Sequence, residues 1–393
     1  MSACKIVTIK AIHQLFKDDE KANAIELVEL NEVGNTIITQ LGLYQIGDKA
    51  LFIQPDYSIP DTEFFKEYHC PGGDKSKSKL GSKGRVKAIK FNFRTETAPA
   101  PVYSYGILIP AEELKKITPD EDGDNLDKIL GITKWEEPEP KGSMDGDSLP
   151  FPQGMYKTDE ENINNLWNEI QYPIKLIGTW KIDGSSITIY CKKLSDGTWK
   201  SGICSRNLEK KLTTKKCIGT RKKTVREWIQ SLFGKKLDLR VFGEMPSDNE
   251  FVKVGEPYLE ALECYCKHHN ISLALRGELC GKGLRGSGNK NNPSCNDEPN
   301  IKFYAIDFID EEGIARRCEE NTFATTINNL GFARCSVLFK DTFNSREQLE
   351  NHCKDIFIRF KEDDKILIEG IVVKTLDGTW SAKFMNLEYD TRK

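Results

Sequence analysis

The chain has 393 residues, of which 30% are charged and 38% are hydrophobic, and its formal net charge is −3. This length predicts roughly two or three domains, and the near-neutral charge excludes a globally basic nucleic-acid-binding protein while allowing local basic patches. No signal peptide or membrane span opens the chain, and its twelve cysteines lack metal-site spacing. We therefore expect a reduced, intracellular protein, either cytoplasmic or nuclear.

Short strand-like segments dominate the first 115 residues. Turn signals separate them, and the segments are 4–9, 24–29, 36–40, 50–54, 87–93 and 103–109. Several short strands in so short a stretch are typical of a small barrel. The sequence therefore predicts an OB-like domain over residues 1–115.

Acidic residues and prolines gather in the next stretch, 116–150. Their mixture predicts a linker with one short amphipathic piece at 127–132. In residues 151–393, strand-like runs alternate with helix-like ones, which are 158–170, 224–233, 257–269 and 345–360. This alternation predicts an α+β domain.

Lys181 follows a mostly apolar run that begins at Ile174, and an Asp-Gly turn at Asp183–Gly184 comes directly after it. A lysine on such a short, rigid loop is a candidate nucleophile, provided that its amine is neutral. Because Lys-x-Asp-Gly is a short pattern, an ordinary hairpin with a solvated lysine is the alternative interpretation.

Four further pieces follow Lys181 in order: Ser205–Asn207, Leu275–Gly281, Lys302–Phe308 and the run from Ile366 to Asn386. The ordered set resembles the motifs of the covalent nucleotidyltransferases, which are DNA ligases, RNA ligases and mRNA capping enzymes. Two Gly-Glu pairs compete for the third motif. We prefer Gly277–Glu278 over Gly243–Glu244 because it lies closer to the strand-like run at 302–308.

The order of the domains distinguishes between these enzymes. In DNA ligases and capping enzymes a second OB domain follows the last motif, whereas here only seven residues follow Asn386 and the barrel-like segment comes first. This order resembles the RNA ligases of the Naegleria and Deinococcus type. The resemblance implies an N-terminal OB-like β-barrel, followed over 151–393 by an ATP-grasp-like nucleotidyltransferase domain with antiparallel sheets and flanking helices.

The resemblance also implies an activity. It implies an ATP-dependent RNA ligase that seals 3′-OH/5′-phosphate nicks in RNA-containing duplexes, through a lysyl-AMP and then an RNA-adenylylate. ATP and Mg²⁺ or Mn²⁺ would be its cofactors and nicked duplex RNA its partner, with no membrane and no second subunit. The alternatives are another covalent nucleotidyltransferase, such as a guanylyltransferase or DNA ligase, and a non-catalytic RNA-binding module.

Three lysines and three carboxylates acquire chemical roles from the resemblance. Lys181 would be the nucleophile, and Lys374 and Lys383 beside it would depress its pKa and stabilise the α-phosphate. The carboxylates resemble ligands that hold a divalent metal, often through water, and they are Asp183, Glu369 and, as a weaker candidate, Asp307.

A second set of residues would bind the nucleotide: Trp180, Ile182, Ser186, Arg206, Glu278, Tyr304, Ile306 and Val372. Arg206 would lie near the ribose and phosphates, Glu278 would accept a ribose hydroxyl, and Val372 would cover one face of adenine. Trp180 stands where these RNA ligases usually have a glutamate. Ile306 stands where many relatives have a stacking aromatic, so either Ile306 packs on adenine or Tyr304 substitutes.

A basic run lies outside these motifs. Lys210–Arg226 holds eight basic residues and no acidic one. It is either a solvated face or a footprint for a phosphate backbone.

Overall fold

The computed structural model describes residues 3–115, 125–135, 148–156, 160–224, 227, 239–284 and 297–389. The chain divides into two compact units, Met1–Pro138 with Asn162–Gln171, and Glu139–Glu161 with Tyr172–Lys393. The predicted boundaries at 115 and 151 differ from this division mainly at Asn162–Gln171, which packs with the first unit. Most of the predicted linker lies outside the described residues.

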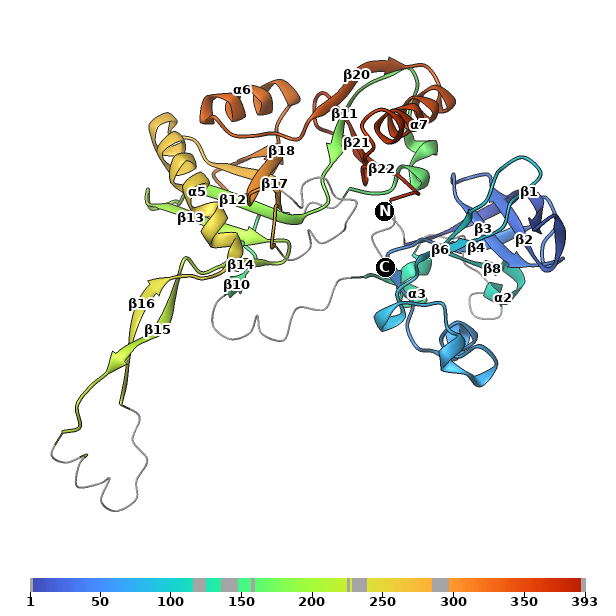
Figure 1. The fold of residues 1–393 in the computed structure, drawn as a ribbon, viewed down its shortest axis with the longest axis horizontal. Helices are drawn as coiled ribbons and strands as arrows, with labels where there is room; N and C mark the ends of the chain where they lie inside the picture. Colours follow the sequence, from blue (N-terminus) through green and yellow to red (C-terminus); the bar gives the residue numbers. More distant parts are fainter. Residues whose placement is uncertain are drawn as a thin grey trace. The chain divides into compact units, whose positions relative to one another are not determined.

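A curled, five-stranded antiparallel sheet forms the first unit (Figure 1). Its order is β3-β2-β1-β4-β8, with β1 Cys4–Lys17, β2 Glu20–Leu30, β3 Thr36–Gln40, β4 Lys49–Ile53 and β8 Ile107–Pro110. Thr36 Oγ1 donates to the Tyr103 carbonyl oxygen at 2.9 Å, and the Ile38 amide donates to Ser104 Oγ at 3.0 Å. These bonds place β7 (Val102–Tyr105) beside β3, so the sheet curls into a half-barrel.

Short elements complete the first unit. They are β5 Tyr57–Ser58, β6 Ala88–Phe91, β9 Thr133–Lys134, α1 Lys66–His69, α2 Ala111–Lys115, α3 Leu126–Ile129 and the 3₁₀ turns η1 Glu63–Phe65, η2 Pro71–Gly73, η3 Lys75–Lys77 and η4 Ser82–Gly84. The strand predicted at 103–109 is divided into β7 and β8 at Gly106. Its φ is +96°, and a Cβ there would lie 2.4 Å from the Ile53 carbonyl oxygen, so only glycine fits the break.

The helix predicted at 158–170 is wrong. The described part forms two 3₁₀ turns instead, η5 Ile163–Asn165 and η6 Trp167–Glu169. Asn165 is buried, donates to Gln54 Oε1 at 2.8 Å and accepts from Asn35 Nδ2 at 2.7 Å. These buried bonds fix the segment to the first unit, and such side-chain bonding competes with a regular helix.

Two antiparallel sheets form the second unit. The first has the order β10-β14-β13-β12-β17-β18-β19, with β10 Ser148–Pro150, β14 Leu208–Lys210, β13 Trp199–Ser205, β12 Ser185–Lys193, β17 Leu273–Cys280, β18 Asn300–Ile309 and β19 Ala315–Arg317. The second has the order β20-β11-β21-β22, with β20 Val337–Phe343, β11 Ile174–Lys181, β21 Gly370–Thr375 and β22 Ser381–Met385. The predicted α+β class with antiparallel sheets and flanking helices is confirmed.

Helices α5 (Glu250–His269) and α6 (Glu320–Leu330) pack against one face of the seven-stranded sheet through a shared apolar cluster. The Asn249 side chain caps α5 by accepting from the Phe251 amide at 3.0 Å. Helix α7 (Arg346–Glu362) lies against the four-stranded sheet, where Phe357 and Phe384 have ring centroids 5.9 Å apart. The helices predicted at 257–269 and 345–360 are confirmed, while most of 224–233 lies outside the described residues.

A two-stranded ribbon, β15 (Thr213–Thr220) with β16 (Arg240–Pro246), projects from the rest of the second unit (Figure 1). We call these two strands, together with residues 211–212 and 221–224 on either side of β15, the arm. Among the described residues, no helix is long and apolar enough to cross a membrane.

Candidate active site

Strand register places three predicted residues on one face of the four-stranded sheet. Lys181 ends β11 and lies opposite Gly370 of β21, while Lys383 of β22 lies opposite Val372. Partners directly across an antiparallel pair point to the same face, and residues two apart on a strand share that face. Lys181, Val372 and Lys383 therefore face the same side.

The seven-stranded sheet contributes three further residues that the sequence predicted for the site. Ser186 of β12 lies directly opposite Glu278 of β17, so their side chains share a face. Arg206 follows the last residue of β13, and its positive charge opposes the rise in the pKa of Glu278. Among the alternatives for the third motif, the structure favours Gly277–Glu278, because Gly243–Glu244 lies on the arm.

Two motif glycines are required by close backbone approaches. A Cβ on Gly184 would lie 2.7 Å from the Leu279 carbonyl oxygen, and a Cβ on Gly370 would lie 2.5 Å from that of Phe384. A real side chain at either position would push the strands apart. Each motif glycine thus lets neighbouring backbone segments of its own sheet approach closely beside Lys181.

Lys181 is held in an ion pair: its Nζ lies 2.6 Å from Glu369 Oε2. Burial opposes the lysine charge, but Glu369, Glu278 and Asp183 outweigh this effect and raise the pKa of Lys181. The prediction that neighbouring lysines depress this pKa is therefore wrong. A lysine with a raised pKa is protonated near neutral pH and must lose that proton before it acts as a nucleophile.

The pocket carries an excess of negative charge. Burial raises the pKa of Glu278 to about 8, with Glu369 and Asp183 adding to the rise. Burial, together with Asp183, also raises the pKa of Glu369, although Lys181 and Lys383 oppose it. Crowded carboxylates of this kind are partly neutralised by protons when no other cation is present.

The donor set fits a hard divalent cation. Asp183 and Glu369 flank Lys181 with carboxylate oxygens, which Mg²⁺ and Mn²⁺ prefer. In the described part of the chain, no group of three or more His, Cys, Asp or Glu side chains is arranged to hold a metal directly. A cation beside Asp183 and Glu369 would relieve the repulsion among the carboxylates.

Tyr389 is a site residue that the sequence analysis missed. Its hydroxyl donates to Asp183 Oδ2 at 2.8 Å and so orients that carboxylate. It follows the last recognised motif, and no local pattern distinguishes it from an ordinary aromatic residue. Only the fold reveals its place beside Asp183.

Next to Lys181 in sequence, Ile182 belongs to an apolar cluster, which we call the apolar wall. The buried residues Ile182, Cys280 and Cys335 form it, and Trp180 and Tyr304 pack against them. The ring of Trp180 also lies 5.4 Å from that of Phe360 on α7. That contact, together with the alternation along β11, places Trp180 on the face opposite Lys181.

The choice between Tyr304 and Ile306 is decided by a β-bulge. Arg276 pairs with Ala305, whereas the next residue, Gly277, pairs with Phe303, so Tyr304 is the extra residue. A bulge re-aims the side chain that it carries. Tyr304 consequently joins the apolar wall, while Ile306 is fully buried in the core under α5 and α6.

Lys374 is not brought beside Lys181. It pairs with Ile177, four residues from Lys181 along β11 and thus roughly 13 Å away. Its Nζ lies 2.8 Å from Glu320 Oε2 and donates to the Tyr304 carbonyl oxygen at 3.0 Å. Burial lowers the pKa of Lys374, although Glu320 opposes this. The lysine thus supports the bulge at Tyr304.

Asp307 is not available to a metal. Its carboxylate is fully buried and accepts from Arg276 Nε at 2.7 Å, from Arg317 Nε at 2.7 Å and from the Tyr156 hydroxyl at 3.0 Å. The guanidinium of Arg276 also donates to Thr188 Oγ1 at 3.0 Å. These contacts place Asp307 in a structural ion cluster, which corrects its prediction as a metal ligand.

Comparisons with known proteins agree with the motif assignment. The RNA ligase family matches residues 174–386 of the chain. The chain belongs to the RNA ligase family. No curated protein matches the sequence significantly.

The fold of this ligase also resembles solved structures over nearly the full chain. A Naegleria gruberi RNA ligase variant with ATP and Mn is 22% identical, with a TM-score of 0.66, covering 99% of this chain and 98% of that one. A second variant, with AMP and Mn, is 21% identical, with a TM-score of 0.66 and coverage of 98% and 97%. The same ligase with PPi is 22% identical, with a TM-score of 0.65 and coverage of 99% and 98%.

Proposed function

We propose that this protein is an ATP-dependent RNA ligase that seals 3′-OH/5′-phosphate nicks in RNA-containing duplexes through a lysyl-AMP intermediate. The observation that carries the proposal is Lys181, which lies on Glu369 where two sheets meet, with Glu278 and Lys383 around it. The Naegleria structures support it, because they hold ATP, AMP or PPi, two of them with Mn.

The first chemical step requires a change at the ion pair. Lys181 must leave Glu369 and give its proton to solvent before its nitrogen attacks the α-phosphorus of ATP. The nitrogen–phosphorus bond forms as the bond to pyrophosphate breaks, and Lys383 stabilises the negative charge that develops there. Asp183 and Glu369 would hold Mg²⁺ or Mn²⁺, which would supply positive charge to the phosphates.

The other residues bind and orient the nucleotide. Glu278 accepts a hydrogen bond from a ribose hydroxyl, and Arg206 lies near the phosphates. Tyr304 and Val372 enclose the base, with Ile182 behind Tyr304. AMP then passes from Lys181 to an RNA 5′-phosphate, and a 3′-hydroxyl displaces it to form the new phosphodiester.

We extend the proposal to the domains and to the setting of the protein. The curled sheet of the first unit would be an OB-like RNA-binding domain, and the second unit an ATP-grasp-like adenylation domain. The described cysteines form no disulfide, which agrees with a reduced compartment, cytoplasmic or nuclear. We propose that the ligase acts as a monomer.

A labelling experiment tests the proposed function. The protein is incubated with labelled ATP or GTP and Mg²⁺ or Mn²⁺, and a covalent adduct is scored. We expect an acid-labile, alkali-stable adduct with ATP, and an advantage over GTP of at least about fivefold, since an unpaired base edge costs about 1–3 kcal/mol. Labelling only by GTP would favour the guanylyltransferase alternative, which the replacement of the usual glutamate by Trp180 keeps open.

A further inference from the structure

The arm lacks the support that a stable ribbon normally needs. Among the described residues, β15 and β16 pair only with each other, and none of their residues is buried. Isolated two-stranded ribbons are marginal in water. Yet Ile218, Phe242 and Met245 are exposed at 58%, 52% and 44%. Exposed apolar groups on an unsupported ribbon are typical of a surface that contacts a partner.

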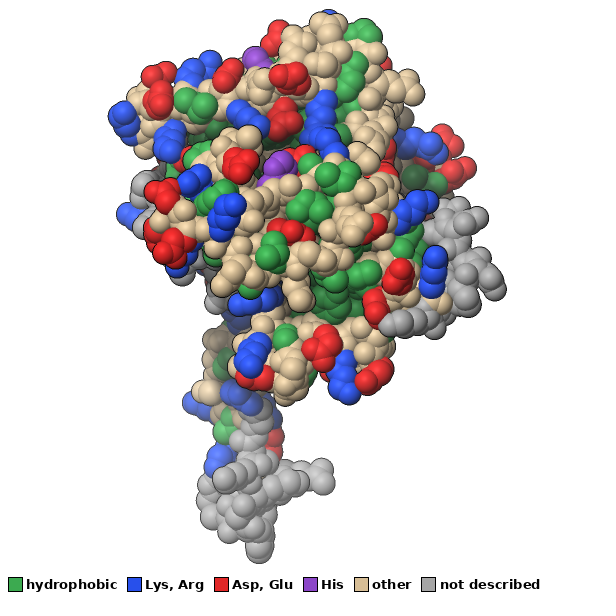
Figure 2. Space-filling view, turned by 90° about the vertical axis from the view of Figure 1, so that its right-hand side faces the viewer, with side chains coloured by type: hydrophobic (Ala, Val, Ile, Leu, Met, Phe, Trp, Pro, Cys, Tyr) green, Lys and Arg blue, Asp and Glu red, His purple; other side chains and the backbone are tan. Residues whose placement is uncertain are grey.

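The charge of the arm indicates the sign of that partner. Seven basic residues and no acidic one lie between residues 210 and 224. Lys216 and Arg221 are paired with acidic residues. For Lys211 and Lys215, no carboxylate lies within ion-pair distance in the described part of the chain. Because the whole protein has a net charge of −3, this is a local basic surface, and Figure 2 shows Lys and Arg side chains along the arm.

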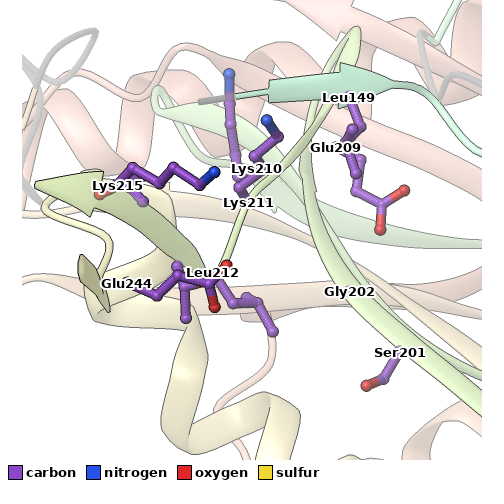
Figure 3. A pocket seen from close by; sticks show the side chains of 11 residues that line it. Leu149, Ser201, Gly202, Glu209, Lys210, Lys211, Leu212, Lys215 and Glu244 are labelled. Carbon is purple, nitrogen blue, oxygen red and sulfur yellow. The ribbon is translucent and has the colours of Figure 1, made fainter. Parts of the chain in front are cut away.

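A hollow at the base of the arm is lined by these lysines. Its volume is about 680 Å³, and Lys210, Lys211 and Lys215 line it together with Glu209 and Glu244. Figure 3 shows the three lysine side chains, with Lys215 extending toward Lys210 and Lys211. Three lysines against two glutamates give the lining of the hollow a positive balance, which suits a polyanion that has several phosphates.

An aromatic residue lies on the same face of the arm as the hollow. Lys215 is directly opposite Glu244, and Cys217 is directly opposite Phe242, so these residues share one face. The guanidinium of Arg240 lies 5.5 Å from the centre of the Phe242 ring. An exposed aromatic ring among cations is the composition by which proteins contact ribose and base edges of nucleic acids.

The arm continues directly from the active site. Strand β13 ends at Ser205, Arg206 follows, and the short strand β14 leads into β15. The basic residues at the start of the arm therefore follow Arg206 closely in the protein sequence. A polynucleotide whose 5′-phosphate reaches Arg206 has these basic residues next to it. The remainder of the bound duplex requires such a surface beyond the reacting ends.

Building on the proposed function, we propose that the arm binds the phosphate backbone of duplex RNA beside the nick. Lys211 and Lys215 neutralise phosphates, and Phe242 enters the minor groove, which is wide and shallow in A-form RNA. The arm thus holds the substrate and does not take part in the chemistry at Lys181.

Binding assays on the full-length protein test this proposal. The test variant is Lys211→Ala with Lys215→Ala, and the matched control is Lys175→Ala with Lys340→Ala, two exposed lysines on β11 and β20. Affinity for a fluorescent nicked RNA duplex is measured by anisotropy over a salt series. We expect the arm variant to bind roughly tenfold more weakly, with a log–log salt slope that is shallower by about 2. The control should match the wild type.

Two further readouts separate this inference from the proposed function. Phe242→Ala should weaken duplex binding at least about fivefold with an unchanged salt slope. Self-labelling with ATP should be normal in every arm variant. Equal affinity and slope in the wild type and the arm variant, or an equal loss in the control, would overturn the inference. If the wild type forms no adduct while the arm variant still loses RNA binding, the proposed function fails and the inference stands.

Discussion

Two charged clusters on the second unit use similar residues in opposite ways. At Asp307, two arginines and a tyrosine surround one carboxylate, and these donors occupy both of its oxygens. At Lys181, three carboxylates surround one lysine, and burial with like charges raises two of their pKa values. The first cluster is saturated, whereas the second lacks positive charge.

The contrast explains why only one of the two clusters is suited to chemistry. A buried carboxylate whose two oxygens both accept from fixed donors has no open coordination position. A cluster with excess negative charge binds a cation and, with it, the phosphates of a nucleotide. The difference is therefore one of charge balance, and the first three predictions below change that balance in one of the two clusters.

Removing the nucleophile should have the largest effect. Lys181→Ala leaves no amine to attack, and Lys181→Arg supplies a guanidinium that is not deprotonated in proteins. We expect neither variant to form labelled adduct with ATP. An acid-labile, alkali-stable adduct in either variant would show that another residue is the nucleophile.

Disrupting the ion cluster at Asp307 should change the free energy of unfolding more than the self-labelling activity. Asp307→Asn leaves the buried Arg276 without its counter-charge, which costs about 3–5 kcal/mol of the free energy of unfolding. Glu350→Gln is the control, because its pairs with Arg346 and Lys354 are partly exposed and contribute less than about 1 kcal/mol. Denaturant titration measures both. A variant of normal stability that no longer labels itself would restore Asp307 as a metal ligand.

Removing one carboxylate from the unbalanced cluster should shift a pH profile. Glu369→Gln withdraws the carboxylate that contributes most to the raised pKa of Lys181, so neutral amine forms at a lower pH. The rising limb of the self-labelling rate should move to lower pH, and the maximal rate should fall roughly 10–100-fold because a metal-holding group is lost. Rates over pH 6.5–9.5 measure this.

The pH range of that experiment avoids a change in stability from the ion pair itself. A raised lysine pKa stabilises the fold fully below the unfolded value, about 10.4, and that stabilisation is lost only as pH rises through the folded value. Glu362→Gln, on the exposed end of α7, is the matched control. If the limb stays in place in Glu369→Gln, the titrating group is not the pair of Lys181 with Glu369.

The smallest effect should separate Tyr304 from Ile306. Tyr304→Ala removes a ring from the apolar wall, and we expect the concentration of ATP for half-maximal labelling to rise at least about fivefold. Ile306→Val deletes one core methylene, which costs about 0.5–1.5 kcal/mol of stability and leaves that concentration unchanged. If Ile306→Val raises that concentration and Tyr304→Ala does not, then Ile306 is the residue that contacts the base.

The ordered motifs lie at or near strand ends, and the fold brings Lys181, Glu278 and Lys383 close to Glu369 or Asp183 there. Lys181, Glu278 and Lys383 therefore follow from the sequence once the family is recognised. The corrections have different causes. Asp307 forms an ion pair with Arg276, which is 31 positions away in sequence. No local sequence pattern indicates this pairing. One extra residue in β18 gives different surroundings to Tyr304 and Ile306, which the sequence left as alternatives for the contact with the base.

The course of the chain between the units has a consequence for dissecting this protein. The polypeptide passes from the first unit to the second after Pro138, returns at Asn162 and leaves again after Gln171. A single proteolytic cut near residue 138 therefore yields two fragments that stay associated, because the larger one carries the segment whose Asn165 is bonded to Gln54 and Asn35. The two units are interleaved in sequence, and a deletion from the N-terminus alone removes the partner of a segment that it leaves behind.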